Sequence, residues 1–192
     1  MSSNNMIEIR NLCHRYVMGS KTLEIINGLE LALEKGKWCC VYGASGSGKT
    51  TLAKRLSDQM GIRCFDLDDL QWDNASLSYG TKRAAEQRDA MLQRILREED
   101  WIIEGVYYAW CGQCFRQADR IYLLEVPRHT YRYRIIRRFI RRKLGREKGK
   151  QETLKSLFDL LKWADKYQQK NLVEIKKILS AYADKVIEYS DK

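Results

Sequence analysis

Short apolar runs alternate with stretches of helical periodicity along most of the chain. Four runs have the pattern of buried strands, at residues 37–43, 62–68, 101–104 and 120–126. Helical periodicity covers 50–60, about 82–98, the residues directly after Pro127 and about 152–183, and 185–189 resembles a last strand. The alternation predicts an α/β fold of three layers, in which helices cover both faces of a parallel, doubly wound central sheet.

The first part of the chain has a different pattern. Residues 7–16 alternate apolar and polar positions, as a half-exposed strand does, and residues 23–36 repeat the alternation. Asn27-Gly28 and Lys35-Gly36 are turn signals. These features predict an antiparallel β ribbon ahead of the central sheet.

Composition places the chain among ordinary globular proteins. It is 44% hydrophobic and 31% charged, unlike disordered chains, and 192 residues fit one domain. No apolar stretch approaches the ~20 residues of a membrane span, and the start has no signal-peptide pattern. We therefore expect a cytoplasmic protein whose six cysteines are reduced.

Two of the cysteines are close in sequence, in Cys111-Gly-Gln-Cys114. Half a zinc site or a redox pair has this spacing, but no second close pair completes four ligands and no strand leads straight into it. We interpret both as thiols without a chemical role.

The sequence GASGSGKT matches the phosphate-binding loop pattern G-x-x-x-x-G-K-[ST] between a predicted strand and a predicted helix. Its three glycines let the backbone curl so that successive N–H groups face phosphates, and the following helix adds its positive end. Lys49, which we predict as catalytic, should reach the β- and γ-phosphates, and Thr50 should offer its hydroxyl to Mg²⁺. We expect ATP and Mg²⁺ here, with the nucleotide on Gly43, Ala44, Ser45, Gly46, Ser47, Gly48, Lys49, Thr50 and Thr51.

Acidic residues end two of the predicted strands, at the edge where parallel sheets bind ligands. Asp66 and Asp68 would project to one side of an extended chain, one toward Mg²⁺ and one toward an acceptor hydroxyl. A polar strand exit that caps a helix is the alternative, and it applies to Asp69 as well. Glu104 could hold a magnesium-bound water or be a solvated strand end. We predict Asp68 as catalytic, and Thr50, Asp66 and Glu104 as metal ligands.

The net charge of +10 is concentrated in residues 128–150, which hold eleven Lys or Arg and the single acid Glu147. Such a local excess indicates one site for a polyanion, and nucleotide phosphates or nucleic acid would both fit. Arginines clamp phosphates and neutralise transition-state charge. The candidates are Arg134, Arg138, Arg141 and Arg142, of which we predict Arg138 and Arg142 as catalytic. Gly145 and Gly149 follow, as in a mobile lid.

From about Gly43 to Tyr189 the chain resembles small nucleotide-kinase-like P-loop proteins, those described as adenylate kinase-related or DNA topology modulation proteins. The segments that carry the resemblance are GASGSGKT with LAKRLS, FDLDDLQW, WIIEGVYY and ADRIYLLEVPRHTYRYRIIRRFIRR. Shikimate kinases share part of this layout, and an Asp-x-Asp ends their second strand. The resemblance implies that Asp68 binds the acceptor hydroxyl and that lid arginines correspond to Arg138, Arg141 and Arg142.

The first fifty residues are instead similar to the start of ABC transporter ATPases, in IEIRNLCHRY and LELALEKGKWCCVYGASGSGKTTL. In that family an aromatic residue at the position of Tyr16 stacks on adenine, which implies the same contact here; plain packing is the alternative. No LSGGQ signature, no apolar strand ending in Asp-Glu and no switch histidine follow. The parts that couple an ABC dimer to transport are therefore missing.

Together these features predict one P-loop domain. Its segments are a β ribbon (1–36), a nucleotide-binding core (37–127), a basic helix and lid (128–150), and a C-terminal helix with the last strand (151–192). We predict an ATP- and Mg²⁺-dependent kinase for a small acceptor, first a nucleoside or nucleotide. The alternatives are an ATPase or regulator that associates with nucleic acid, and an ABC-type cassette. The acceptor's identity and the oligomeric state stay open.

Overall fold

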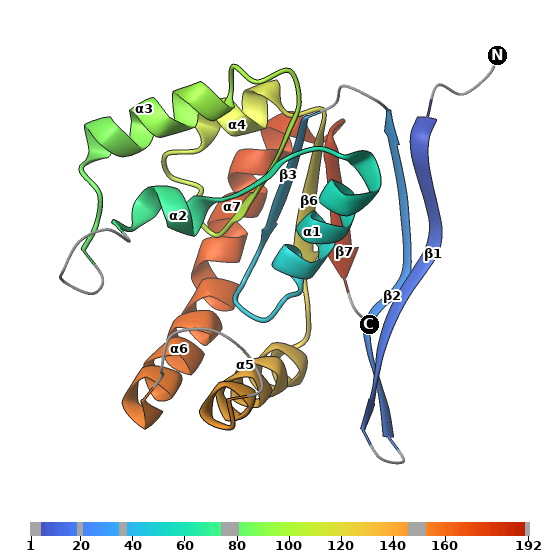
Figure 1. Ribbon diagram of the computed structural model, residues 1–192, viewed down its shortest axis with the longest axis vertical. Helices are drawn as coiled ribbons and strands as arrows, with labels where there is room; N and C mark the ends of the chain where they lie inside the picture. Colours follow the sequence, from blue (N-terminus) through green and yellow to red (C-terminus); the bar gives the residue numbers. More distant parts are fainter. Residues whose placement is uncertain (1–4, 19–20, 35–37, 74–80, 146–152, 191–192) are drawn as a thin grey trace.

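Five short parallel strands form the centre of the molecule (Figure 1). The computed structural model describes residues 5–18, 21–34, 38–73, 81–145 and 153–190, with side chains from Trp38 onward. The strands are β3 (Trp38–Gly43), β4 (Cys64–Asp66), β5 (Trp101–Gly105), β6 (Arg120–Glu125) and β7 (Val186–Ser190), in the spatial order β4-β5-β3-β6-β7. The predicted α/β fold with a parallel sheet is confirmed. Because the order reverses at β3, the end of β3 lies at the switch point where such sheets bind ligands.

Seven α-helices of the described chain connect or follow these strands. They are α1 (Lys49–Met60), α2 (Leu67–Gln71), α3 (Ala85–Ile95), α4 (Gly112–Gln117), α5 (Arg128–Lys143), α6 (Leu154–Lys166) and α7 (Leu172–Leu179). A π-helical turn, Tyr167–Asn171, joins α6 to α7 within the helical stretch predicted at 152–183, and a 3-10 turn, Ser180–Tyr182, follows α7. Sequence periodicity missed α2 and α4, because five or six residues are too few to display a helical period. No helix in the described part of the chain is long and apolar enough to cross a bilayer.

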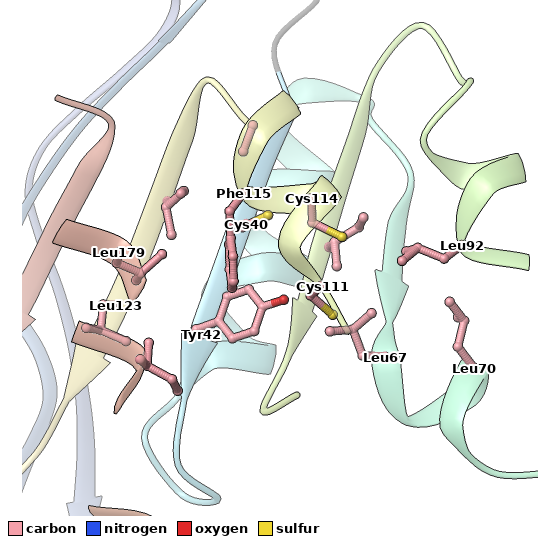
Figure 2. Close-up of a cluster of buried hydrophobic side chains, with 14 of the residues drawn as sticks. Cys40, Tyr42, Leu67, Leu70, Leu92, Cys111, Cys114, Phe115, Leu123 and Leu179 are labelled. Carbon is pink, nitrogen blue, oxygen red and sulfur yellow. The ribbon is translucent and has the colours of Figure 1, made fainter. Parts of the chain in front are cut away.

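Alternate residues of the central strands pack against helices on opposite faces of the sheet. On one face, Cys39 and Val41 of β3 meet Leu52 of α1. On the other, Cys40 and Tyr42 point into a larger core formed with side chains of α2, α3, α4 and α7 (Figure 2). Because helices cover both faces, β3 and β5 are buried along nearly their whole length, which explains their continuous apolar sequences.

The N-terminal ribbon is a separate antiparallel sheet of β1 (Asn5–Met18) and β2 (Lys21–Glu34). β1 approaches α1, and the ribbon extends past one end of the central sheet (Figure 1). A two-stranded ribbon is only marginally stable alone. It therefore depends on neighbouring parts of the fold or on a partner.

The turn predicted at Asn27-Gly28 is wrong, because β2 continues through both residues. The register of the ribbon shifts at this point, between the pair that precedes these residues and the pair that follows them. An Asn-Gly pair is compatible with a bulge in a strand as well as with a turn.

A third hydrophobic cluster joins α5 to α6 beyond the end of β6. Tyr131 and Ile135 of α5 pack in it against Leu157 and Leu161 of α6. At its edge, Asp165 of α6 accepts hydrogen bonds from Arg128 at 2.6 Å, Arg132 at 2.7 Å and the Tyr131 hydroxyl at 2.7 Å. These donors, above all Arg128, lower the pKa of Asp165 to about 2.

We expect Asp165→Asn to lower the free energy of unfolding by about 1–2 kcal/mol near neutral pH, because an amide satisfies two cationic donors poorly. The pKa of Asp165 is depressed in the folded state, so its contribution is complete above the ordinary aspartate range and declines as pH falls toward about 2. Urea unfolding of both proteins at neutral and acidic pH measures this. Asp159→Asn, at an exposed position of the same helix, is the control. If the difference in unfolding free energy between Asp165→Asn and the wild type stayed the same at low pH, the stabilising role of the ionised Asp165 would be contradicted.

Candidate functional site

The loop between β3 and α1 has the geometry of an anion cradle. Gly46 and Gly48 have φ angles of 82° and 97°, which glycine adopts without strain. At Gly43 a Cβ would lie 2.4 Å from Ser47 Oγ, so a side chain has no room there. Helix α1 starts at Lys49 without a side-chain cap, which leaves the N–H groups of its first turn to an anion.

A buried carboxylate, Glu104 at the end of β5, lies beside the start of α1. Glu104 is 1% exposed. The Thr50 hydroxyl donates a hydrogen bond to its Oε1 at 2.7 Å, and Lys49 Nζ lies 3.5 Å from its Oε2. A carboxylate this deeply buried requires a compensating cation. Lys49 provides that charge, and the three predicted residues are in contact.

Thr50 and Glu104 fit the requirements of Mg²⁺, which prefers hydroxyl and carboxylate oxygens. Glu104 Oε2 is buried and accepts no hydrogen bond from any described residue, so it is available as a ligand. No group of three or more Cys, His, Asp or Glu residues is arranged for a metal in the described parts of the chain. A nucleotide site does not require one, because Mg²⁺ there takes most of its ligands from phosphates and water.

Asp66 is placed differently from the prediction. β4 ends at Asp66 and α2 begins at Leu67, so the expectation of an extended chain through Asp68 is wrong. The Asp66 carboxylate caps α2 by accepting a hydrogen bond from the Asp68 N–H at 2.8 Å. Burial and the neighbouring Glu104 raise the pKa of Asp66 to about 7. The role of Asp66 as a metal ligand stays a prediction.

Asp68 lies in the first turn of α2 with an exposed side chain. The Tyr107 hydroxyl donates a hydrogen bond to its Oδ1 at 2.7 Å, and Trp72 Nε1 donates to the Tyr107 oxygen at 3.0 Å. Sequence reasoning missed both aromatic residues. The signal for Tyr107 was its place just after β5, at the edge of the sheet where ligands bind.

Helix α5 packs directly on the phosphate loop. A Cβ on Gly46 would lie 2.8 Å from the carbonyl oxygen of Tyr131 in α5. Arg134 donates a hydrogen bond to the Gly46 carbonyl at 3.0 Å, and Arg138 donates to Ser45 Oγ at 3.4 Å. Two of the predicted arginines therefore contact the loop itself. The helical part of the predicted lid is docked on the loop, and residues 146–152 lie outside the described residues.

The basic residues of α5 are spread over several of its faces. Those near its start bind Asp165, and those in its middle contact the loop. Arg141 and Arg142 lie one turn further along and are partly buried. The exposed face carries the aliphatic side chains Ile136, Ile140 and Leu144. A nucleic acid lying along that face would therefore contact aliphatic side chains as well as basic ones.

Two nucleotide contacts predicted from the sequence remain predictions. Thr51 lies in the first turn of α1 with an exposed side chain. Tyr16 lies in β1, where it pairs with Leu23, but its side chain is outside the described part of the structure. Contact between Tyr16 and adenine therefore stays an inference from the ABC-like sequence.

Cys111 and Cys114 are both buried and free, in the core that also contains Tyr42 (Figure 2). A hydrogen bond with Cys111 and burial raise the pKa of the Cys114 thiol well above its ordinary value. Thiolates are the reactive form of cysteine. This pair therefore has the environment of core thiols, as we interpreted it.

Comparison with protein families gives a match that includes the phosphate loop. Residues 39–155 match the family described as AAA domain. Among curated proteins, the chain is 35% identical over 78 residues to the energy-coupling factor transporter ATP-binding protein EcfA of Pediococcus pentosaceus, covering 36% of this chain and 28% of that protein. It is 47% identical over 53 residues to a putative ABC transporter ATP-binding protein of Methanosarcina acetivorans, covering 27% and 15%. The chain thus spans 28% or less of the length of these relatives.

Among solved structures, the chain is similar to a gluconokinase from Sinorhizobium meliloti, with a TM-score of 0.49 and 14% identity over 81% of this chain and 83% of that one. It is also similar to a shikimate kinase from Bacteroides thetaiotaomicron, with a TM-score of 0.47 and 17% identity over 72% and 82% of the two chains.

Proposed function

The chain belongs to the AAA domain family and carries a P-loop nucleotide-binding domain, and on this premise we propose that it is an ATP- and Mg²⁺-dependent phosphotransferase. Its acceptor is a small molecule with a hydroxyl or phosphate group, and nucleosides and nucleotides are the first candidates. A cytoplasmic location is part of the same proposal.

The observation that carries the proposal is a second carboxylate at the exit of the strand that pairs with β5, the strand of Glu104. Glu104 is buried and contacts Lys49 and Thr50, and together these residues would hold the nucleotide phosphates and the metal. Asp68, at the exit of the neighbouring strand β4, is exposed and held by Tyr107. The first acid holds the metal in an ATPase and in a kinase alike. The second acid serves in a kinase as the base for the acceptor hydroxyl, whereas in an ATPase it would orient the attacking water, and the assay below distinguishes the two.

Each residue then has a defined task in the reaction. The loop N–H groups and Lys49 would hold the donor phosphates, and Thr50 and Glu104 would hold Mg²⁺, which would supply positive charge to the departing phosphoryl group. Asp68 takes the proton of the acceptor hydroxyl while that oxygen bonds to the γ-phosphorus. The bond from the γ-phosphorus to the β–γ bridging oxygen breaks, and ADP leaves with its electrons. Arg138 and Arg142 neutralise the transferring group.

A coupled ADP-release assay tests this proposal. ATP and Mg²⁺ are supplied with a panel of nucleosides, nucleoside monophosphates and shikimate-like alcohols, together with a control without acceptor. Stimulation by one class of compound supports the kinase and identifies its acceptor. Turnover that no acceptor stimulates would contradict it.

We expect Asp68→Asn to lower acceptor-stimulated turnover by about 100-fold, because the amide cannot take the hydroxyl proton. ATP affinity should not change, because Asp68 has no task at the donor phosphates. Asp69→Asn, the neighbouring exposed carboxylate on α2, is the matched control and should retain full turnover. Equal rates for Asp68→Asn and the wild type would remove Asp68 from the mechanism.

An ABC-type ATPase is the second candidate, favoured by the similarity to transporter ATP-binding proteins. ABC-type sites close only between two subunits. ATP-induced dimerisation with acceptor-independent hydrolysis, measured by light scattering and phosphate release, would favour this candidate over the kinase.

A further inference from the structure

The Asp68 carboxylate is the end of a short hydrogen-bond chain. Trp72 Nε1 donates to the Tyr107 oxygen at 3.0 Å, and the Tyr107 hydroxyl donates to Asp68 Oδ1 at 2.7 Å. Each donor in the chain polarises the next, so the bond to the carboxylate is stronger than an isolated one. Asp68 is otherwise on an exposed helix turn, where an aspartate side chain normally samples several rotamers.

The fold brings these three residues together from two strand exits. Asp66 of β4 is level with Glu104 of β5, so the segments that follow the two strands run side by side. A Cβ on Gly105 would lie 2.7 Å from Leu67 Cβ, which means that the exit of β5 touches the first residue of α2. That close approach places Tyr107 within hydrogen-bond distance of Asp68.

The Tyr107 ring is itself held in place by its surroundings. It stacks on Trp110 with ring centroids 5.6 Å apart, and the Arg88 guanidinium lies 4.5 Å from the centre of the Trp110 ring on which Tyr107 stacks. Burial and the Asp68 carboxylate raise the pKa of the Tyr107 hydroxyl above its ordinary value. The hydroxyl therefore stays protonated near neutral pH and remains a donor.

We propose that Tyr107, supported by Trp72, is a positioning residue that fixes the Asp68 carboxylate for proton abstraction from the acceptor. Tyr107 occupies Oδ1, so Oδ2 is the oxygen that takes the acceptor's proton. This inference rests on the proposed phosphotransferase function and adds to it the residues that orient the base. Tyr107 itself neither accepts the proton nor binds the donor.

Tyr107→Phe tests the proposal because it removes one hydroxyl and keeps the ring on Trp110. With an acceptor from the nucleoside and alcohol panel that stimulates the wild type, kcat should fall about 10- to 100-fold. The KM for ATP and acceptor-independent hydrolysis should not change. Tyr108→Phe is the control, because that hydroxyl donates to Glu174 of α7, and it should retain wild-type kcat. A wild-type kcat for Tyr107→Phe would overturn the inference, whereas a wild type that no acceptor stimulates would overturn the proposed function.

A double-mutant cycle separates positioning from general loss of packing. Trp72→Phe should lower kcat several-fold in the wild type and have almost no further effect in Tyr107→Phe, because both changes interrupt one chain. Independent, additive effects of the two substitutions would contradict a role for the hydrogen-bond chain from Trp72 through Tyr107 to Asp68. A crystal structure of Tyr107→Phe gives a readout that needs no acceptor: Asp68 in more than one rotamer supports the inference, and the single wild-type rotamer overturns it.

Discussion

Lys49→Met should lower ATP-dependent turnover by roughly 10³-fold, the largest effect that we predict, because the loop lysine supplies its charge directly to the β- and γ-phosphates. The variant should also lose about 1–3 kcal/mol of unfolding free energy. In the wild type Lys49 Nζ lies 3.5 Å from the buried Glu104 carboxylate, and removing one member of such a pair leaves an uncompensated buried charge. Phosphate release and urea unfolding measure the two effects.

The two effects of Lys49→Met can be separated. Lys49→Met combined with Glu104→Gln should recover most of the lost stability, because no buried charge then remains, while turnover stays at the lower level. Lys54→Met, an exposed lysine of the same helix, should change neither quantity. Wild-type turnover of Lys49→Met, under conditions in which the variant is fully folded, would show that Lys49 acts only through the stability of the fold.

Glu104→Gln should lower Mg²⁺-dependent turnover by about 10²- to 10³-fold. The glutamine can still accept a hydrogen bond from Thr50, but it is a much weaker ligand for Mg²⁺ than a carboxylate. Affinity for ATP without metal should be unchanged or higher, because a negative charge near the phosphates is removed. Calorimetric titration of ATP with and without Mg²⁺ distinguishes the two expectations.

Glu125→Gln is the matched control for Glu104→Gln, since Glu125 also ends a strand of the same sheet but pairs with Lys176 of α7 at 2.7 Å. It should leave the response to Mg²⁺ unchanged. If Glu104→Gln kept wild-type turnover at saturating Mg²⁺, with a normal Mg²⁺ requirement, Glu104 would have no role at the metal.

The parallel sheet and the phosphate loop could be predicted because their signals are local. A strand buried on both faces has a continuous apolar sequence wherever it lies in the sheet, and the loop requires glycines and a lysine at fixed spacing. Glu104 could be singled out for the same reason, as an acid that ends an apolar strand. Its contacts with Lys49 and Thr50 depend on β5 lying next to β3, and the order of strands has no local signature.

The conformation around Asp68 could not be predicted in the same way. Three acids in a short segment are compatible with an extended chain or with a capped helix, and in the folded chain Asp66 caps α2 while Leu67 packs against Gly105. Tyr107 is thirty-nine positions from Asp68 in the sequence. The basic sequence of α5 indicates a site for anions. Which of its arginines contact the phosphate loop depends on how the helix packs, and the sequence alone does not show it.

By itself, the sequence determined the α/β architecture, the phosphate-binding loop and the concentration of positive charge after β6. These depend on periodicity, spacing and composition, which are properties of neighbouring residues. Only the tertiary structure decided that Glu104 joins Lys49 and Thr50, that Tyr107 holds Asp68, and that α5 docks on the loop through Arg134. Each of these contacts joins segments far apart in the chain, and each follows from the strand order and from close backbone approaches at Gly46 and Gly105.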